Sequence, residues 1–357
     1  MFRKCRDMRK CFILFSLLIS ASSYAQTEVS NYLPGKNSEG VTYFLPKTSI
    51  DITVKAEKTT YTPGDFCRYA EKYLRLTGIA TAPDEQWAIK SVSITPIGTP
   101  DTEQAFTIKL KDKTVAPLVE LTEDGIIKAI NTAYPTTPAK AVQEEKEAPA
   151  LNPRDFLTEE ILMAGSTAKM AELTAKEIYN IRESKNAITR GQADNMPKDG
   201  ESLKIMLSSL EKQEQALMQL FTGRTTKESK VFTVKVTPTG DIDKEVLFRF
   251  SKKLGIVPAS DLSGSPVYLT LTNQNTVPKP TEEEKAKKKL DGVVYNVPGK
   301  ADIIISNGAK TLYKGELTLS QFGNTEVLTN NLFNKKTTTK VTFDPTTGGL
   351  IKIEAEN

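Results

Sequence analysis

The chain has 357 residues, of which 38% are hydrophobic and 26% charged, a balance typical of globular proteins. Its formal net charge is +4, but five basic residues and one acidic residue lie in the first 25 positions, so the remainder carries equal numbers of each sign. A chain this close to neutral lacks the basic surface that nucleic-acid binding requires. It contains no histidine, which excludes Ser-His-Asp and Cys-His catalysis and histidine-ligated zinc.

The first 25 residues have the three parts of a secretory signal peptide. Basic residues between positions 3 and 10 precede an apolar run at 12–19, which is too short to span a bilayer. Ser23-Tyr24-Ala25 then offers a cleavage site, and either Met1 or Met8 leaves a basic leader if translation starts there. We therefore expect an exported protein, periplasmic or extracellular, whose mature chain begins near position 26.

Residues 26–134 predict an N-terminal β-rich domain with one short helix. Strands are expected at 41–45 and 50–58, where apolar and polar residues alternate, and at 87–96 and 105–110, joined by a connection rich in proline and glycine. Asp65 follows a Pro-Gly turn and is placed to cap a short helix over 66–76. Residues 121–130 are typical of a hairpin that turns at Glu123-Asp124-Gly125.

Residues 135–155 predict a linker, because they are rich in proline and charge and hold few large apolar side chains. Residues 156–223 predict a long helical hairpin. Its second arm repeats leucines at three- and four-residue spacing between Asp199, a candidate N-cap, and Gly223, a candidate helix end. Its first arm covers about 166–190, and the segment 191–200 contains Pro197 and makes the turn.

Residues 224–357 predict a C-terminal β-rich domain, with strands at 231–238, 267–272, 293–297, 302–306, 311–319, 341–343 and 350–354, and a short helix at 244–254. Residues 66–73 align with 247–254, which places Cys67 opposite Phe248, and residues 124–128 align with 348–352. An internal duplication explains these matches, and chance similarity of short segments is the alternative. The expected fold class is therefore α+β: two β-rich domains, related by a duplication or not, flank a central long α-helical hairpin.

Three stretches carry a resemblance to a known family. They are residues 40–48 (GVTYFLPKT), residues 63–74 and residues 178–184 (IYNIRES). The chain resembles a secreted family of Bacteroidetes-type bacteria that is known as a domain of unknown function. The resemblance runs from about position 40 to the C-terminus; it implies export and one architecture for the whole chain, and it implies no site residue or cofactor.

Motifs that suggest catalysis or metal binding have simpler explanations. Cys67 has no histidine to make it a nucleophile, and its place beside Phe66 predicts a buried core cysteine. Ser166 and Lys169 match the Ser-x-x-Lys pattern of penicillin-recognising enzymes, but the partner motifs are absent and Ser166 fits a helix N-cap. The alternating acidic residues at 241, 243 and 245 lack the glycine of a calcium loop. We expect no metal, no cofactor and no catalytic residue.

Aromatic residues concentrate in the first β-rich flank and suggest a surface on which a sugar could stack. An arginine in the first helical arm could hold a ligand carboxylate, although a salt bridge along the helix also explains it. The candidate ligand-binding residues are Tyr43, Tyr61, Tyr69, Tyr73, Trp87 and Arg182.

Three functions remain open from the sequence. The first is a non-catalytic exported scaffold or interaction module whose partner is an envelope protein. The second is a binding protein for a glycan or small ligand that uses the aromatic flank. The third is a hydrolase centred on Ser166.

Overall fold

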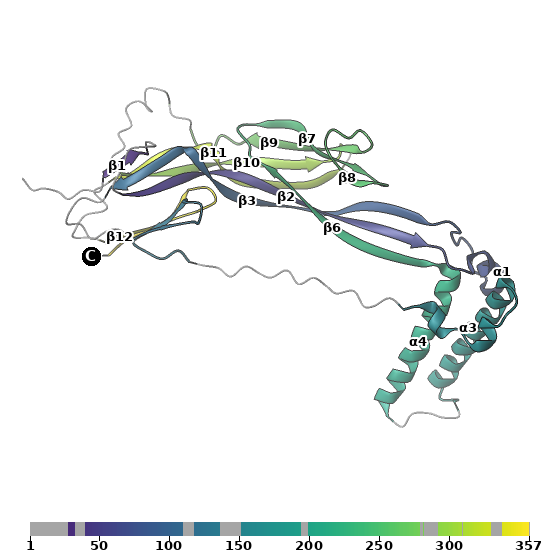
Figure 1. Cartoon of the computed structure of the whole chain (residues 1–357). Coiled ribbons are helices and arrows are strands. Elements are labelled where there is room, and N and C mark those ends of the chain that lie inside the picture. Colours follow the sequence, from purple (N-terminus) through teal and green to yellow (C-terminus); the bar gives the residue numbers. More distant parts are fainter. Residues whose placement is uncertain are drawn as a thin grey trace, which may run out of the picture.

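The computed structural model describes residues 28–32, 40–109, 118–135, 151–193, 199–278, 281, 292–308, 310–329 and 338–356. The expected signal peptide at 1–25 and most of the expected linker, residues 136–150, lie outside these ranges. Of the described residues, 52% are in strands and 23% in helices. The strands form three antiparallel sheets, and the two longest helices lie together at one end of the molecule (Figure 1).

The first sheet is built on a long hairpin. Its strand order is β1-β3-β2-β6, with β1 at Glu28–Asn31, β2 at Val41–Thr62, β3 at Asp84–Lys109 and β6 at Arg224–Val236. The two strands expected at 87–96 and 105–110 are one strand, and the proline-rich stretch between them pairs with β2. Prolines are tolerated there because β1 pairs only with residues 106–109, which leaves the other edge of β3 free around Pro96 and Pro100.

The second sheet has the order β11-β10-β9-β7-β8, formed by β7 at Ile242–Ser251, β8 at Gly255–Val257, β9 at Ser265–Asn273, β10 at Gly292–Ser306 and β11 at Thr311–Thr329. It packs face to face on the first sheet. Their shared core includes Ile50, Ile52 and Val54 from β2, together with Phe248, Leu269 and Ile303. Burying these apolar faces against each other is the main stabilising term of a β-sandwich.

The third sheet joins distant parts of the chain. Its order is β13-β12-β5-β4, with β4 at Val119–Leu121, β5 at Ile127–Ile130, β12 at Thr338–Phe343 and β13 at Leu350–Glu356. The hairpin predicted at 121–130 is confirmed, since β4 pairs with β5 around a turn in which Gly125 donates to the carbonyl of Thr122. β5 also pairs with β12, so one sheet contains strands from both expected β-rich flanks.

The helices are placed beyond the sheets. β2 leads into η1 (Cys67–Tyr69) and α1 (Ala70–Leu74). η1 contacts α4 (Gly200–Thr222) and α1 contacts α3 (Thr167–Thr189), while η2 (Pro153–Phe156) lies against α4 and α2 (Glu159–Leu162) against α3. Ser166 and Asp199 cap α3 and α4 as predicted, and Gly223 ends α4. We call these helices the helical tip (Figure 1). None of the helices in the described ranges has the length and apolar character needed to cross a membrane.

The expected fold class is therefore wrong in its architecture. The protein is mostly β, its sheets mix strands from both flanks, and no long helical hairpin occupies the centre. The expected helix at 244–254 is strand β7, because Phe248 is buried in the sandwich core and the strand pairs with both β8 and β9. Since Cys67 lies in a helix and Phe248 in a strand, the expected correspondence between them is also wrong.

The structure does contain a repeated unit with a different register. Gly40-Val41-Thr42-Tyr43 begins the β2–β3 hairpin, and Gly292-Val293-Val294-Tyr295 begins the β10–β11 hairpin. In the first unit the N–H of Phe44 donates to Gly125 O at 2.9 Å; in the second the N–H of Asn296 donates to Gly348 O at 3.0 Å. Each long hairpin therefore holds the turn of a short hairpin in the third sheet in the same way.

Tyr43 ties the two units together. Its hydroxyl, fully buried, accepts from the N–H of Val294 at 2.9 Å and donates to the carbonyl of Val294 at 3.1 Å. Burial raises the pKa of the Tyr43 phenol, while the hydrogen bond to Val294 lowers it by less, so the hydroxyl stays protonated at neutral pH. Tyr43 is thus the buried link between the start of β2 and its counterpart in β10.

Replacing Tyr43 with Phe is expected to lower the free energy of unfolding by about 1–3 kcal/mol, because two buried backbone groups of Val294 lose their partner. Urea denaturation measures the loss. Tyr32→Phe is the matched control, since Tyr32 is 39% exposed. Equal stability of the two variants would contradict the structural role of the hydroxyl.

Candidate functional site

The structure separates the residues that the sequence suggested as one ligand site. Tyr43 lies in the sheet core, whereas Tyr61 lies 18 positions further along β2, which is about 60 Å at roughly 3.3 Å per residue. The Tyr61 hydroxyl lies 2.8 Å from Ala80 O and 3.1 Å from Thr222 O, so it joins the far end of the long β2–β3 hairpin to the end of α4. These two tyrosines do not share a surface.

Trp87 braces the long hairpin against the second sheet. The backbone N–H of Trp87 donates to Lys252 O at 2.7 Å, and a Cβ on Gly255 would lie 3.0 Å from the Trp87 ring. Lys253, in the same turn, places its Nζ 2.6 Å from Asp84 Oδ1. The turn between β7 and β8 is thus attached to the start of β3, which is the end of the strand nearest the helices.

The helical tip brings three of the suggested residues near one another. Its core is a separate apolar cluster that includes Phe66, Leu74, Ile178, Leu217 and Phe221. The predicted core cysteine, Cys67, is half-buried beside this cluster. The N–H of Phe66 donates to Leu220 O at 2.7 Å, which fastens the start of η1 to α4. This core fixes η1, α1, α3 and α4 relative to one another.

Along the edge of this core lies a group of tyrosines with cations beside them. Tyr69 and Tyr73 are half-buried against the core, and Tyr179 is exposed. The rings of Tyr69 and Tyr73 are 6.2 Å apart, and the hydroxyl of Tyr179 on α3 donates to Tyr73 O at 3.2 Å. Lys72 Nζ lies 5.0 Å from the centre of the Tyr73 ring, and Arg182 Cζ lies 5.8 Å from that of Tyr179. We call Tyr69, Tyr73 and Tyr179, with Lys72 and Arg182, the tyrosine surface.

Sequence reasoning identified Tyr69, Tyr73 and Arg182 but missed Tyr179 and Lys72. Tyr179 lies three positions before Arg182 on α3, a spacing that puts both side chains on one helix face. Tyr179 is also 46% exposed. Helical spacing therefore contained the signal for Tyr179, but only the fold shows that α1 and α3 meet there.

Arg182 has a fixed partner rather than a free charge. Its Nε donates to Glu214 Oε1 at 2.6 Å, and Lys185 Nζ lies 3.1 Å from Glu214 Oε2. Burial raises the pKa of Glu214, but the hydrogen bonds from Arg182 and Lys185 together hold it below its ordinary value of 4.5. The salt bridge links α3 to α4; it does not follow α3 as the sequence suggested.

The pKa of Glu214 predicts a specific dependence on pH. Because the folded pKa is lowered, the contribution of the ionised carboxylate is fully present above the unfolded pKa and is lost as pH falls through the folded pKa. Glu214→Gln should cost about 1 kcal/mol at pH 7 for this partly exposed network, and the difference from the parent protein should shrink below pH 4.5.

Urea denaturation between pH 3 and pH 8 measures the Glu214 effect. Glu211→Gln is the control, because Glu211 is 57% exposed and lies 3.9 Å from Lys185. A Glu214→Gln penalty that is constant across this pH range would contradict the assignment.

A groove of about 580 Å³ runs between α3 and α4, over the network of Arg182, Lys185 and Glu214. Gln219 lines it, and Gln219 Oε1 is a buried oxygen without a hydrogen-bond partner among the described residues. Such an atom is uncommon in a folded protein.

Ser166 is the N-cap of α3 and accepts from the N–H of Lys169 at 3.3 Å. Lys169 Nζ lies 2.7 Å from Glu172 Oε1, and this hydrogen bond raises the pKa of the amine. A protonated lysine paired with a carboxylate does not take a proton from a serine.

Asp241, from the acidic run at 241–245, accepts from the N–H of Asn273. The described residues hold no group of three or more potential metal ligands of the His, Cys, Asp or Glu type.

Taken together, these features define a mostly antiparallel β protein with a separate helical tip that carries a tyrosine surface. The chain belongs to the family described as domain of unknown function DUF4831, whose family model matches residues 39–351. No curated protein and no solved structure matches it.

Proposed function

We propose that this protein is a non-catalytic, exported interaction module of the cell envelope that binds a protein partner through its helical tip. The single observation that carries the proposal is the tyrosine surface, placed at the end of the molecule beyond the sandwich (Figure 1). Tyrosine and arginine dominate the binding energy of protein interfaces, because they combine apolar area with hydrogen-bonding groups.

Exposed apolar side chains on the same tip support this proposal. On α2, Leu162 is 58% exposed, and Met163, directly after it, is 77% exposed; on α4, Ile205 is 65% exposed. Methionine and aromatic residues are enriched at interfaces. Gly64, at the connection between the long β2–β3 hairpin and the helical tip, has no room for a Cβ against the end of α4, so we expect the surface to be held in one orientation.

Site-specific photocrosslinking tests the proposal. A photoreactive residue at Tyr179 should crosslink one envelope protein in cells, and the same residue at Tyr32 should not. Tyr32 is a suitable control because it is 39% exposed but lies beside the sheets. The captured protein should then bind the purified chain directly, and Tyr179→Ala should weaken that binding by about tenfold or more, equivalent to about 1.4 kcal/mol. Equal crosslinking from both positions, or binding that Tyr179→Ala leaves unchanged, would reject the tip as the interface.

The alternative function, binding of a glycan or small ligand through the aromatic flank, has less support. Tyr43 is buried, and the half-buried ring of Trp87 lies against Gly255 with Lys230 Nζ 5.6 Å from its centre, so little of either ring is open to a sugar. Neither the groove between α3 and α4 nor the cavity between the two long hairpins is lined by tyrosine or tryptophan. We therefore expect a small-ligand site at a different place in the fold.

A further inference from the structure

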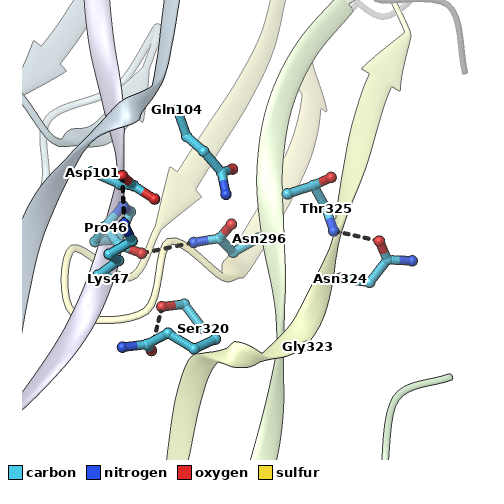
Figure 2. A pocket seen from close by; sticks show the side chains of 10 residues that line it. Pro46, Lys47, Asp101, Gln104, Asn296, Ser320, Gly323, Asn324 and Thr325 are labelled. Carbon is cyan, nitrogen blue, oxygen red and sulfur yellow. Dashed lines mark hydrogen bonds and ion pairs between the residues drawn. The ribbon is translucent and has the colours of Figure 1, made fainter. Parts of the chain in front are cut away.

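A cavity of about 280 Å³ lies between the two long hairpins, where each of them bulges. On β3, residues 101–104 lie opposite the single residue Leu45 of β2. On β11, residues 320–323 lie opposite the single residue Pro298 of β10. Bulges expel side chains from the regular pairing and are common beside binding sites. Here the two bulges face each other and supply the cavity walls from both repeated units (Figure 2).

The charged groups of the cavity neutralise each other. Asp101 has a side chain only 5% exposed, and Lys47 Nζ lies 2.9 Å from its Oδ1, which also accepts the N–H of Glu103 at 3.1 Å. Lys47 is 42% exposed, so this wall of the cavity opens to solvent. A buried carboxylate that is paired in this way adds no net charge for an ionic ligand to meet.

Some polar groups of the cavity are committed to the fold. Gln321 donates to Thr48 O at 2.9 Å and to Pro238 O at 3.1 Å, and its Oε1 accepts from the N–H of Thr48 and from Ser320. These bonds hold the β11 bulge against β2. They leave Gln321 no capacity for a ligand.

Other polar groups point into the cavity without a partner. Asn296 is only 5% exposed; its Nδ2 donates to Pro46 O and Thr347 O, but its Oδ1 has no partner among the described residues. The amide of Gln104 has none either, and Figure 2 shows its end turned towards Asn296. Asn324 accepts the N–H of Thr325, and Figure 2 shows its amide end turned away from Gln104 and Asn296. The cavity thus presents both amide donors and amide acceptors.

We propose that this cavity binds a neutral polyhydroxylated ligand of the size of one saccharide unit. A hydroxyl donates and accepts at the same time, so it matches amide oxygens and amide nitrogens side by side. A charged ligand would have to disrupt the pair between Lys47 and Asp101. The volume is slightly below the roughly 300 Å³ at which pockets for drug-sized ligands begin, which suits a single sugar ring.

Isothermal titration and saturation-transfer NMR on the purified full chain test the proposal. The probes are glucose, galactose, mannose and N-acetylglucosamine, with inorganic phosphate and glutamate as charged comparisons. At least one sugar should bind saturably, and Gln104→Ala should weaken it by about tenfold, the effect of losing one good hydrogen bond. Gln86→Ala is the matched control, because Gln86 lies on the same strand and its side chain bonds only Asp84 among the described residues.

Three outcomes would overturn the proposal: no sugar binds, phosphate or glutamate binds more tightly than every sugar, or binding is the same in Gln104→Ala and Gln86→Ala. Circular dichroism and urea denaturation of each variant separate a loss of binding from a loss of fold. The result is independent of the helical tip, so the interaction proposed there is tested separately.

Discussion

Replacing Phe221 with Ala is expected to lower the stability of the helical tip by about 3–5 kcal/mol, the usual cost of removing a buried phenylalanine. Phe221 is fully buried, and its ring lies 5.5 Å from that of Phe66. Its apolar cluster is separate from the two clusters between the sheets. The loss should therefore be confined to the tip, which would unfold locally while the sandwich remains folded.

Hydrogen exchange followed by mass spectrometry measures the Phe221 effect. Peptides of α3 and α4 should exchange faster in Phe221→Ala, whereas peptides of β9 and β10 should keep their protection. Met206→Ala on the same helix is the control, because Met206 is 37% exposed and should change exchange very little. Faster exchange of the sheets to the same extent would show that tip and sandwich unfold as one unit.

Replacing Gly64 with Ala should cost about 3 kcal/mol, at the upper end of the usual range for overpacking. A Cβ at this position would overlap the carbonyl oxygen of Leu220 and would lie 2.5 Å from that of Gln219. These are backbone atoms, so the strain is relieved only if the chain of β2 moves away from the end of α4. We therefore expect both lower stability and a change in the orientation of the tip.

Urea denaturation and small-angle X-ray scattering detect the two effects of Gly64→Ala. Gly240→Ala is the matched control, because a Cβ there meets nothing within 4 Å. If Gly64→Ala and Gly240→Ala give the same scattering curve and the same stability, the connection between the β2–β3 hairpin and the helical tip is not closely packed. A destabilised Gly64→Ala protein should also bind a tip partner less well, since the tyrosine surface spans η1, α1 and α3.

Local features of the fold could be predicted wherever the signal lies in neighbouring residues. The ends of α3 and α4 follow from Ser166, Asp199 and Gly223, because caps are chosen by the unsatisfied backbone groups of the first and last turns. The hairpin of β4 and β5 follows from its turn in the same way. The candidate site was predicted less well: Tyr69, Tyr73 and Arg182 lie near one another on the tip, but Tyr43, Tyr61 and Trp87 are spread along β2 and β3.

The errors arose where the outcome depends on distant pairing. Leu247 and Phe248 suit either a helix or a strand by composition. The segment forms a strand because it pairs with β9 and buries Phe248 in the sandwich core. The long strand β3 looked interrupted because of its prolines, but only the position of β1 reveals that their missing N–H groups fall on a free edge.

The cavity could not be foreseen, because its walls at Gln104 and Asn296 are far apart in sequence and meet only when two repeated hairpins face each other.

The sequence by itself determined the helices of the tip, the short hairpin at 121–130, the near-neutral charge and the absence of imidazole chemistry, because each depends on composition or on residues within a few positions of each other. Only the tertiary structure decided that the sheets mix both flanks, that the helices lie at one end, and where polar side chains converge. Strand pairing in this protein connects residues more than 200 positions apart, as Ile130 and Val341 show. A contact of that kind leaves no periodic trace in either segment alone.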